Sequence, residues 1–241
     1  TMRDRAIAFV PASGRQCTTL STMFGSHLQG MPIIAENGTY VVRDGVDISS
    51  STIDPNLTRE VITGVRQLRN DGHDVGLVVA TKSIAYLERG DDPFVSHVAT
   101  YYHSHRIVKD LSEHTDDVIK LSIYDFREAS EATYPTMQRT APEHQVILAT
   151  PNWVDIMNPG VNKGSAVEAV QRDLGVTADQ TAIFGDFLND LEMMPMAKWS
   201  FAMASGHPNI VKASNYVAPP NTENGVITVL AALLGTRVPI T

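Results

Sequence analysis

Two aspartates stand four positions apart, directly after a short apolar run, in the segment IFGDFLNDLEMM. Gly185 lets the backbone turn tightly, so Asp186 is expected at the C-terminal edge of a strand. Asp190 is then expected in the first turn of the next helix, where the helix dipole favours an anion. Two neighbouring carboxylates repel unless a cation lies between them, and Mg²⁺ takes one or two carboxylates plus water and phosphate oxygens. The pair therefore suits a magnesium ion, and the alternative is an N-capping aspartate at a solvated helix start.

Two further segments offer groups that bind phosphate. In VNKGSAV, Lys163 stands at an expected helix start, where a cation and free backbone N–H groups form a seat for phosphate. In PASGRQ, Ser13 and Gly14 follow an expected strand, and a hydroxyl with a backbone N–H can bind a phosphate oxygen. The alternatives are an ordinary exposed lysine and a serine that only caps a helix.

The elements after residue 158 alternate regularly between helix and strand. The apolar spacing predicts a helix in NKGSAVEAVQRDLG that ends at Gly175, strands in TAIF and WSFAMA, a short helix in LNDLEMMPMA and a final helix in NTENGVITVLAALLG. Such alternation predicts a mainly parallel sheet with helices on both faces. Ligands bind outside the C-terminal strand ends of these sheets, which is where Asp186 is expected.

The first part of the chain contains two segments with different patterns of predicted elements. Residues 5–11 predict a buried strand and residues 13–28 a helix, and Asn37-Gly38 between apolar runs predicts a hairpin. Residues 53–158 predict a self-contained α+β insert, with one amphipathic helix in DPNLTREVITGVRQLRNDG and strands in HDVGLVVAT, DVIKLSIYDF, QVILAT and WVDIM. We therefore expect a core domain of residues 1–52 with 159–241, and a second domain of residues 53–158.

Composition excludes several classes of protein. The chain has 241 residues and a net charge of -8, which is a poor match for nucleic acid or anionic membrane surfaces. No apolar run reaches the length of a spanning helix, and the first residues contain no signal-peptide stretch. Cys17 is the single cysteine, which excludes an internal disulfide and fits a cytoplasmic location. We expect no nucleic-acid or membrane partner, and a monomer or homodimer.

Several short motifs together resemble a known family. ASGR, AENG, NKG, GDFLND, FAMA and NTENGV stand in the order found in the Cof-like branch of the haloacid dehalogenase superfamily of phosphatases. The resemblance spans about residues 1–50 and 155–235, and GDFLND with an upstream NKG is its most specific part. It implies an α/β fold with a three-layer, Rossmann-like parallel sheet core. The insert is similar to the family's C2-type cap domain in position and length.

The resemblance also implies roles for individual residues. Ser13, with Gly14, corresponds to the phosphate-binding hydroxyl of the second motif, and Lys163 to the catalytic lysine that neutralises phosphate and nucleophile charge. Asp186 corresponds to a Mg²⁺ ligand. Asp190 corresponds to the second acid of that motif, which supports the metal site and catalysis. Asn189 is expected to bond to the substrate phosphate or to its surroundings.

The family's nucleophile is missing from this pattern. It is the first aspartate of a DxDGT-like segment that ends the first strand, and the 241 residues contain no Asp-x-Asp. IAFVPASGR could itself be a decayed first motif, with Val10 and Ala12 at the aspartate positions. The interval from Arg15 to Asn37 suits one helix and one strand, which favours Ser13 as the second motif. We therefore expect a truncated chain or a natural non-enzyme, and favour truncation.

The predicted function is a Mg²⁺-dependent hydrolase, a phosphatase of small phosphorylated metabolites such as sugar phosphates. The intact protein would act through an aspartyl-phosphate intermediate, and residues 1–241 alone are expected to be inactive. The alternative is a non-catalytic protein of the same fold that binds phosphate or a metabolite without turnover.

Overall fold

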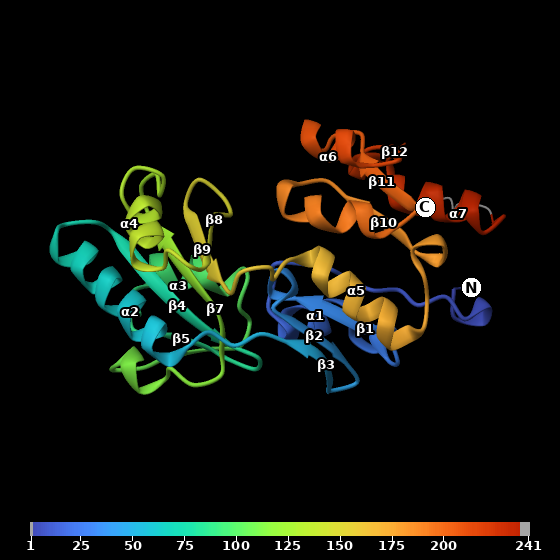
Figure 1. The fold of residues 1–241 in the computed structure, drawn as a ribbon. Coiled ribbons are helices and arrows are strands. Elements are labelled where there is room, and N and C mark those ends of the chain that lie inside the picture. The colour runs from blue at the N-terminus through green and yellow to red at the C-terminus, as the bar shows by residue number, and fades with distance from the viewer. Residues whose placement is uncertain (1, 237–241) are drawn as a thin grey trace. The chain divides into compact units, whose positions relative to one another are not determined.

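The computed structural model describes residues 2–236, which form two compact units, Thr1–Val161 and Asn162–Thr241. Figure 1 shows the first unit in blue to yellow and the second in orange to red. The predicted division into a core (1–52 with 159–241) and an insert (53–158) stays a prediction. No helix in residues 2–236 is long and apolar enough to span a bilayer.

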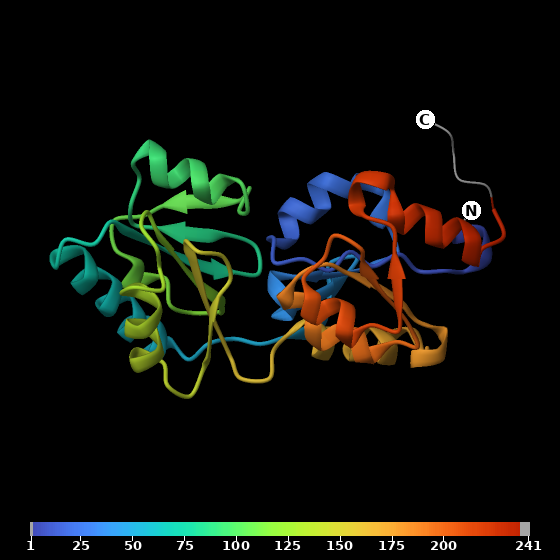
Figure 2. The same ribbon diagram turned by 90° about the horizontal axis from the view of Figure 1, so that it is seen from above.

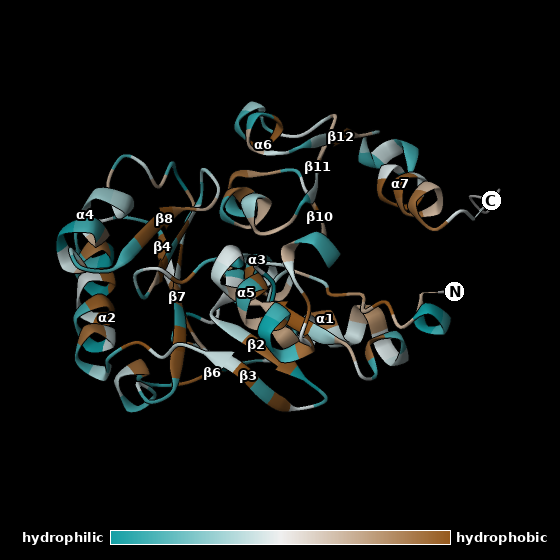
Figure 3. Ribbon diagram, turned by 45° about the vertical axis from the view of Figure 1, so that its right-hand side comes forward, coloured by the Kyte–Doolittle hydropathy of each residue, from teal (hydrophilic) through white to brown (hydrophobic). Residues whose placement is uncertain are grey.

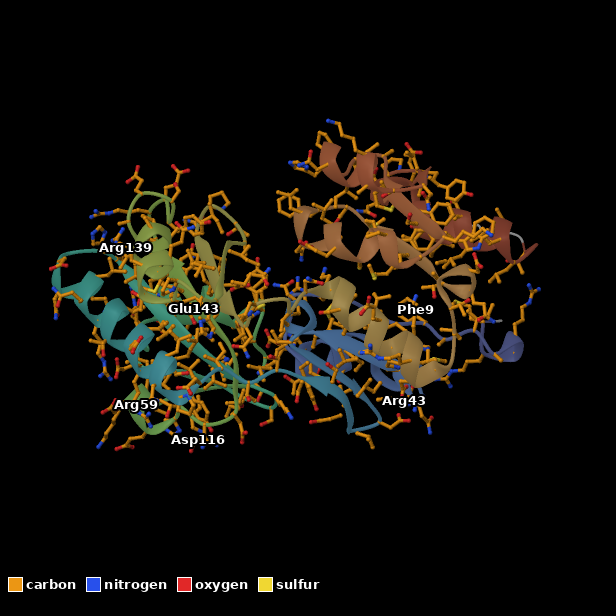
Figure 4. All side chains as sticks on the ribbon, viewed as in Figure 1. Phe9, Arg43, Arg59, Asp116, Arg139 and Glu143 are labelled. Carbon is orange, nitrogen blue, oxygen red and sulfur yellow. The ribbon has the colours of Figure 1, made fainter. Side chains whose placement is uncertain are left out.

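The N-terminal stretch carries one incorrect prediction. After a 3-10 turn η1 (Arg3–Arg5), residues 5–11 form no strand, and the only ladder contact here is an isolated parallel bridge between Ala12 and Ile34. A strand needs a partner along its length, and within this unit only Pro11 to Ser13 run beside one. Phe9 is accordingly 37% exposed, and Figure 4 labels it.

The predicted helix at 13–28 is present but begins later. α1 covers Cys17–Phe24 and continues as the 3-10 turn η2 (Gly25–Leu28). Residues 13–15 form a loop instead. The carbonyls of Ser13 and Arg15 accept hydrogen bonds from the N–H groups of Asn37 and Glu36, and the Gly14 carbonyl accepts one from Nζ of Lys120, so these carbonyls do not propagate a helix.

The predicted hairpin at Asn37-Gly38 is confirmed. β1 (Pro32–Ala35) and β2 (Tyr40–Arg43) pair antiparallel across the turn η3 (Glu36–Gly38), and β3 (Val46–Ser50) extends the sheet. Glu36 and Asn37 adopt positive φ, as does Gly38, which makes the turn tight.

The rest of the first unit is built on a six-stranded mixed sheet. Its strand order is β6-β5-β4-β7-β9-β8, and only β5 and β6 pair in parallel. The strands are β4 (Val75–Thr81), β5 (Ala85–Leu87), β6 (His105–Ile107), β7 (Val118–Asp125), β8 (Gln145–Leu148) and β9 (Trp153–Met157). The helices are α2 (Pro55–Asn70), α3 (Asp92–Ala99), the 3-10 turn η4 (Leu111–Glu113) and α4 (Thr133–Thr140). The strands and the long helix predicted for residues 53–158 are all present.

Side-chain alternation gives this sheet two different faces. Leu121 and Ile123 of β7 pack with α2 and α4 in one apolar cluster, whereas Tyr124 packs with α3 residues in another. Figure 2 shows α3 on one side of the sheet, with α2 and α4 on the other. Figure 3 shows apolar segments on β4 and β8 and an alternating pattern along α2, as expected of an amphipathic helix. The labelled Arg59, Asp116, Arg139 and Glu143 are exposed on the outside of this unit (Figure 4).

The second unit follows the predicted alternation. Its parallel sheet has the order β10-β11-β12, formed by β10 (Ala182–Gly185), β11 (Trp199–Met203) and β12 (Tyr216–Ala218). The helical elements are α5 (Lys163–Leu174), η5 (Ala178–Gln180), η6 (Leu188–Met196), α6 (Pro208–Ala213), η7 (Asn221–Glu223) and α7 (Gly225–Leu233). Gly175 ends α5 in the left-handed conformation, as predicted.

Candidate active site

The two aspartates lie where the sequence places them, after β10 and in the first turn of η6. Gly185 is required here, because a Cβ at this position would lie 2.9 Å from the Cβ of Asp190. The Oδ2 atom of Asp190 accepts hydrogen bonds from the backbone N–H groups of Asp186, at 3.0 Å, and Phe187, at 3.4 Å. The Asp190 carboxylate therefore closes the loop that carries Asp186.

Lys163 completes a buried ion pair with Asp190. Its Nζ lies 2.6 Å from Oδ1 of Asp190, and both side chains are less than a tenth exposed. Lys163 is the first residue of α5, which Asn162 and Ser165 cap reciprocally. The cation at the start of α5 is therefore held by Asp190.

Close packing of α5 against η6 brings the ion pair together. A Cβ added to Gly164 would lie 2.3 Å from the carbonyl oxygen of Glu192, so only glycine fits at this contact. The glycine of the NKG motif is therefore needed to bring the neighbouring lysine close to η6.

Asp186 itself is exposed while its backbone is fixed. Its carbonyl oxygen accepts a hydrogen bond from the N–H of His207 at 2.8 Å. Its Oδ2 atom accepts one from Nδ2 of Asn221 at 3.1 Å. Sequence reasoning assigned no role to Asn221, although it begins the NTENGV motif that carried part of the family resemblance.

These residues fit a magnesium ion bound through few protein ligands. The Asp186 carboxylate is a hard oxygen ligand open to solvent, whereas both oxygens of Asp190 already accept bonds from Lys163 and the backbone. Among residues 2–236 no cluster of three or more His, Cys, Asp or Glu side chains suits a metal. Mg²⁺ fits such a site because it commonly keeps several waters and takes one or two carboxylates.

Three candidate residues remain, one on η6 and two in the first unit. Asn189 is exposed on η6. Ser13 and Gly14 belong to the first unit, where Oγ of Ser13 accepts a hydrogen bond from the N–H of Arg15 at 3.2 Å. That Ser13 faces Lys163 and Asp186 stays a prediction, as do the assigned roles of all these residues.

The fold and this cluster define an α/β protein with a lysine–aspartate pair at the end of a parallel strand. A sequence profile of the haloacid dehalogenase-like hydrolases matches residues 1–230, and the chain belongs to that family. The predicted superfamily and Cof-like branch are therefore confirmed.

Several relatives of this chain are phosphatases by name. A 5-amino-6-(5-phospho-D-ribitylamino)uracil phosphatase of Escherichia coli is 28% identical over 244 residues, which cover 99% of this chain and 87% of the relative. The HMP-PP phosphatase of Cronobacter sakazakii is 21% identical over 87% of this chain and 76% of the relative. The chain therefore lies in a family of phosphatases whose members act on phosphorylated metabolites.

Solved structures confirm the predicted α/β fold class, a Rossmann-like core with a cap. A haloacid dehalogenase-like hydrolase from Bacteroides thetaiotaomicron superposes with a TM-score of 0.84 at 20% identity, covering 96% of this chain and 88% of that one. The subclass IIB sugar phosphatase BT4131 superposes with a TM-score of 0.76 at 20% identity, covering 97% and 87%.

Proposed function

We propose that this protein is a Mg²⁺-dependent phosphatase of small phosphorylated metabolites such as sugar phosphates. The observation that supports it best is the buried Lys163–Asp190 pair beside the exposed carboxylate of Asp186. A cation and a hard oxygen ligand at one strand end are what a phosphate monoester and its metal need.

Each residue of the proposed site has a separate role. Asp186 would hold the metal, which when bound would neutralise charge on the phosphoryl oxygens. Asp190 fixes the Asp186 loop and holds the Lys163 ammonium in place. Lys163 neutralises the phosphate, while the Ser13 hydroxyl, the Gly14 N–H and Asn189 bind its oxygens.

Turnover requires an aspartate nucleophile. Its carboxylate oxygen attacks phosphorus in line, the bond to the leaving alkoxide breaks, and the alkoxide takes up a proton. Water then hydrolyses the aspartyl-phosphate and releases phosphate. Because the 241 residues contain no Asp-x-Asp, the rival function is binding of phosphate or a metabolite without turnover. An in-frame DxDGT segment upstream of Thr1 in the gene supports the enzyme, and a stop codon there supports the rival.

The experiment measures hydrolysis of p-nitrophenyl phosphate by the full gene product, with Mg²⁺ or with excess EDTA. Activity should require Mg²⁺, and Asp186→Asn should abolish it because the substitution removes the open carboxylate ligand. Asp116→Asn, on the exposed surface of the first unit, is the matched control and should retain full activity. Undiminished hydrolysis in EDTA, or by Asp186→Asn, would show that the metal site is wrongly assigned. Phosphate binding without hydrolysis would favour the rival.

A further inference from the structure

A second lysine–carboxylate cluster lies in the first unit, and the proposed reaction does not use it. Nζ of Lys120 on β7 lies 2.5 Å from Oε2 of Glu36 in the hairpin turn and 3.9 Å from Oδ2 of Asp155 on β9. All three side chains are less than a tenth exposed. Burying three charges costs free energy, which the contacts within the cluster must offset.

The cluster lies on one face of the six-stranded sheet. Strand alternation puts Lys120 and Ser122 on the face opposite to Leu121, and Ser122 is directly paired with Asp155 across the sheet. Oγ of Ser122 donates to Oδ1 of Asp155 at 2.6 Å, and Asn37 Nδ2 donates to its Oδ2 at 3.3 Å. The turn that carries Glu36 and Asn37 therefore packs on polar strand residues.

Electrostatics keep the lysine charged. Burial by itself lowers the pKa of Lys120, but Asp155 and Glu36 outweigh this and hold that pKa well above its usual range. Burial raises the pKa of Glu36 despite the opposing effect of Lys120, and the charge of Asp155 raises it further. Two carboxylates share one ammonium, so Lys120 remains a donor of charge-assisted hydrogen bonds.

Lys120 directs one of these bonds to the predicted phosphate loop. Its Nζ donates to the carbonyl oxygen of Gly14 at 3.1 Å. The carbonyls on either side are also held, since Ser13 O accepts from Asn37 N–H and Arg15 O from Glu36 N–H, each at 3.0 Å. Three consecutive carbonyls are thus fixed by the hairpin turn and by Lys120. A Cβ at Gly14 would lie 2.9 Å from Oδ1 of Asn37, so any larger residue here would have to displace the Asn37 side chain.

Peptide geometry converts these anchors into the orientation of the serine. In a trans peptide the C=O and the following N–H point in opposite directions. Holding the Gly14 carbonyl therefore directs the Arg15 N–H away from Lys120, and this N–H donates to Oγ of Ser13 at 3.2 Å. Holding the Ser13 carbonyl likewise directs the Gly14 N–H to the other side of the loop.

We propose that Lys120 is a positioning residue for phosphate binding: by holding the Gly14 carbonyl, it sets the Arg15 N–H and through it the Ser13 hydroxyl. Lys120 thereby couples the six-stranded sheet to the phosphate loop. The proposal rests on the proposed function, in which Ser13 and Gly14 bind phosphate.

The test measures inorganic phosphate affinity by calorimetry in the full-length protein, which needs no turnover. Glu36→Gln/Lys120→Met removes the donor and preserves the net charge of the cluster, because one anion and one cation are lost together. Compared with the wild-type protein, whose cluster has the same net charge, the double variant should bind phosphate at least tenfold more weakly. Tyr102→Phe is the matched control: it removes only the 3.0 Å contact between the Tyr102 hydroxyl and Ser122, and should leave phosphate affinity unchanged.

A second measurement uses the wild-type protein, so that it does not depend on the variants folding. Phosphate titrated into selectively ¹⁵N-labelled protein should shift the NMR signals of the Gly14 amide and the Lys120 ammonium together. A folded double variant that binds phosphate as tightly as the wild-type protein would overturn the role of Lys120, as would a Lys120 signal that does not respond at saturation. Wild-type protein that binds no phosphate would instead overturn the proposed function, and the role of Lys120 with it.

Discussion

The molecule contains two buried lysine–carboxylate pairs that differ in what surrounds them. The Lys163–Asp190 pair lies beside an exposed aspartate, and Asp190 also accepts two backbone hydrogen bonds. Oε2 of Glu36 forms an ion pair with Lys120, and in the described part of the chain neither Glu36 oxygen accepts a hydrogen bond. If Lys163 were lost, Asp190 would keep its two backbone hydrogen bonds. If Lys120 were lost, Glu36 would be buried with no hydrogen-bond donor.

This difference separates two uses of a buried ion pair. In the second unit the pair fixes a loop whose open carboxylate can meet a ligand. In the first unit all three charged side chains of the cluster are buried, and they fix the shape of a backbone loop. A buried pair by itself is weak evidence for either stability or function, so the neighbours of each pair must decide.

The largest expected effects come from replacing each lysine by methionine. Lys120→Met should lower the free energy of unfolding by about 3–5 kcal/mol, the usual cost of stranding a buried charge, and Lys163→Met by less because Asp190 keeps its backbone donors. Activity should rank the other way. Lys163→Met should lose on the order of 100-fold or more in turnover, as when a group that stabilises transition-state charge is removed.

Urea unfolding of the full gene product measures the loss of stability in each variant. The kinetics of p-nitrophenyl phosphate hydrolysis measure the loss of turnover. Glu168→Ala, on the exposed side of α5, is the control and should change neither quantity. If Lys163→Met proved the more destabilising variant, the contrast between the two clusters would fail.

A smaller effect should appear in the pH dependence of stability. Burial raises the pKa of Glu36 above its usual value of 4.5, so the folded chain holds this proton more tightly than the unfolded chain. The stability contributed by Glu36 is then fully present below about pH 4.5 and is lost as pH rises through the folded pKa. Each unit between the two pKa values is worth about 1.4 kcal/mol.

Glu36→Gln should remove this contribution. The unfolding free energy of wild type minus that of the variant should fall as pH rises from 4.5 toward neutrality. Urea unfolding at a series of pH values measures it. A constant difference across that range would mean that Lys120 keeps Glu36 ionised throughout, and that the pKa of Glu36 is not raised.

The same contrast explains which features could be predicted from the sequence. Local signals were sufficient for α5 with Gly175, for Asp190 in the first turn after β10, and for the hairpin at Asn37, because each depends on neighbours in the chain. The family motifs marked Lys163 in the same way.

Features that depend on contacts between residues far apart in the sequence could not be predicted in this way. The expected strand at 5–11 is absent because strands depend on distant partners, which apolar composition does not reveal. Lys120 interrupts the apolar strand VIKLSIY, but its partners Glu36 and Gly14 lie far away in the sequence. A lysine and a serine within a buried strand were the available signal, and only the fold shows what they meet.

The smallest expected effect concerns Asn221. It sharpens the comparison by testing whether solvent can replace a partner of Asp186 in the cluster around Lys163. Asn221 donates to the Oδ2 atom of Asp186 on the protein surface, so water can replace it after substitution by alanine. Groups that orient a metal ligand typically contribute tenfold or more to affinity, and this exposed one should contribute at most about tenfold. The concentration of Mg²⁺ that half-activates p-nitrophenyl phosphate hydrolysis should rise by that factor in Asn221→Ala, with kcat at saturating Mg²⁺ nearly unchanged. Thr222→Ala, at the adjacent exposed position, should have no effect. A loss of kcat that Mg²⁺ cannot restore would place Asn221 in the reaction itself. The cluster around Lys163 would then be as sensitive to the loss of a partner as the cluster around Lys120.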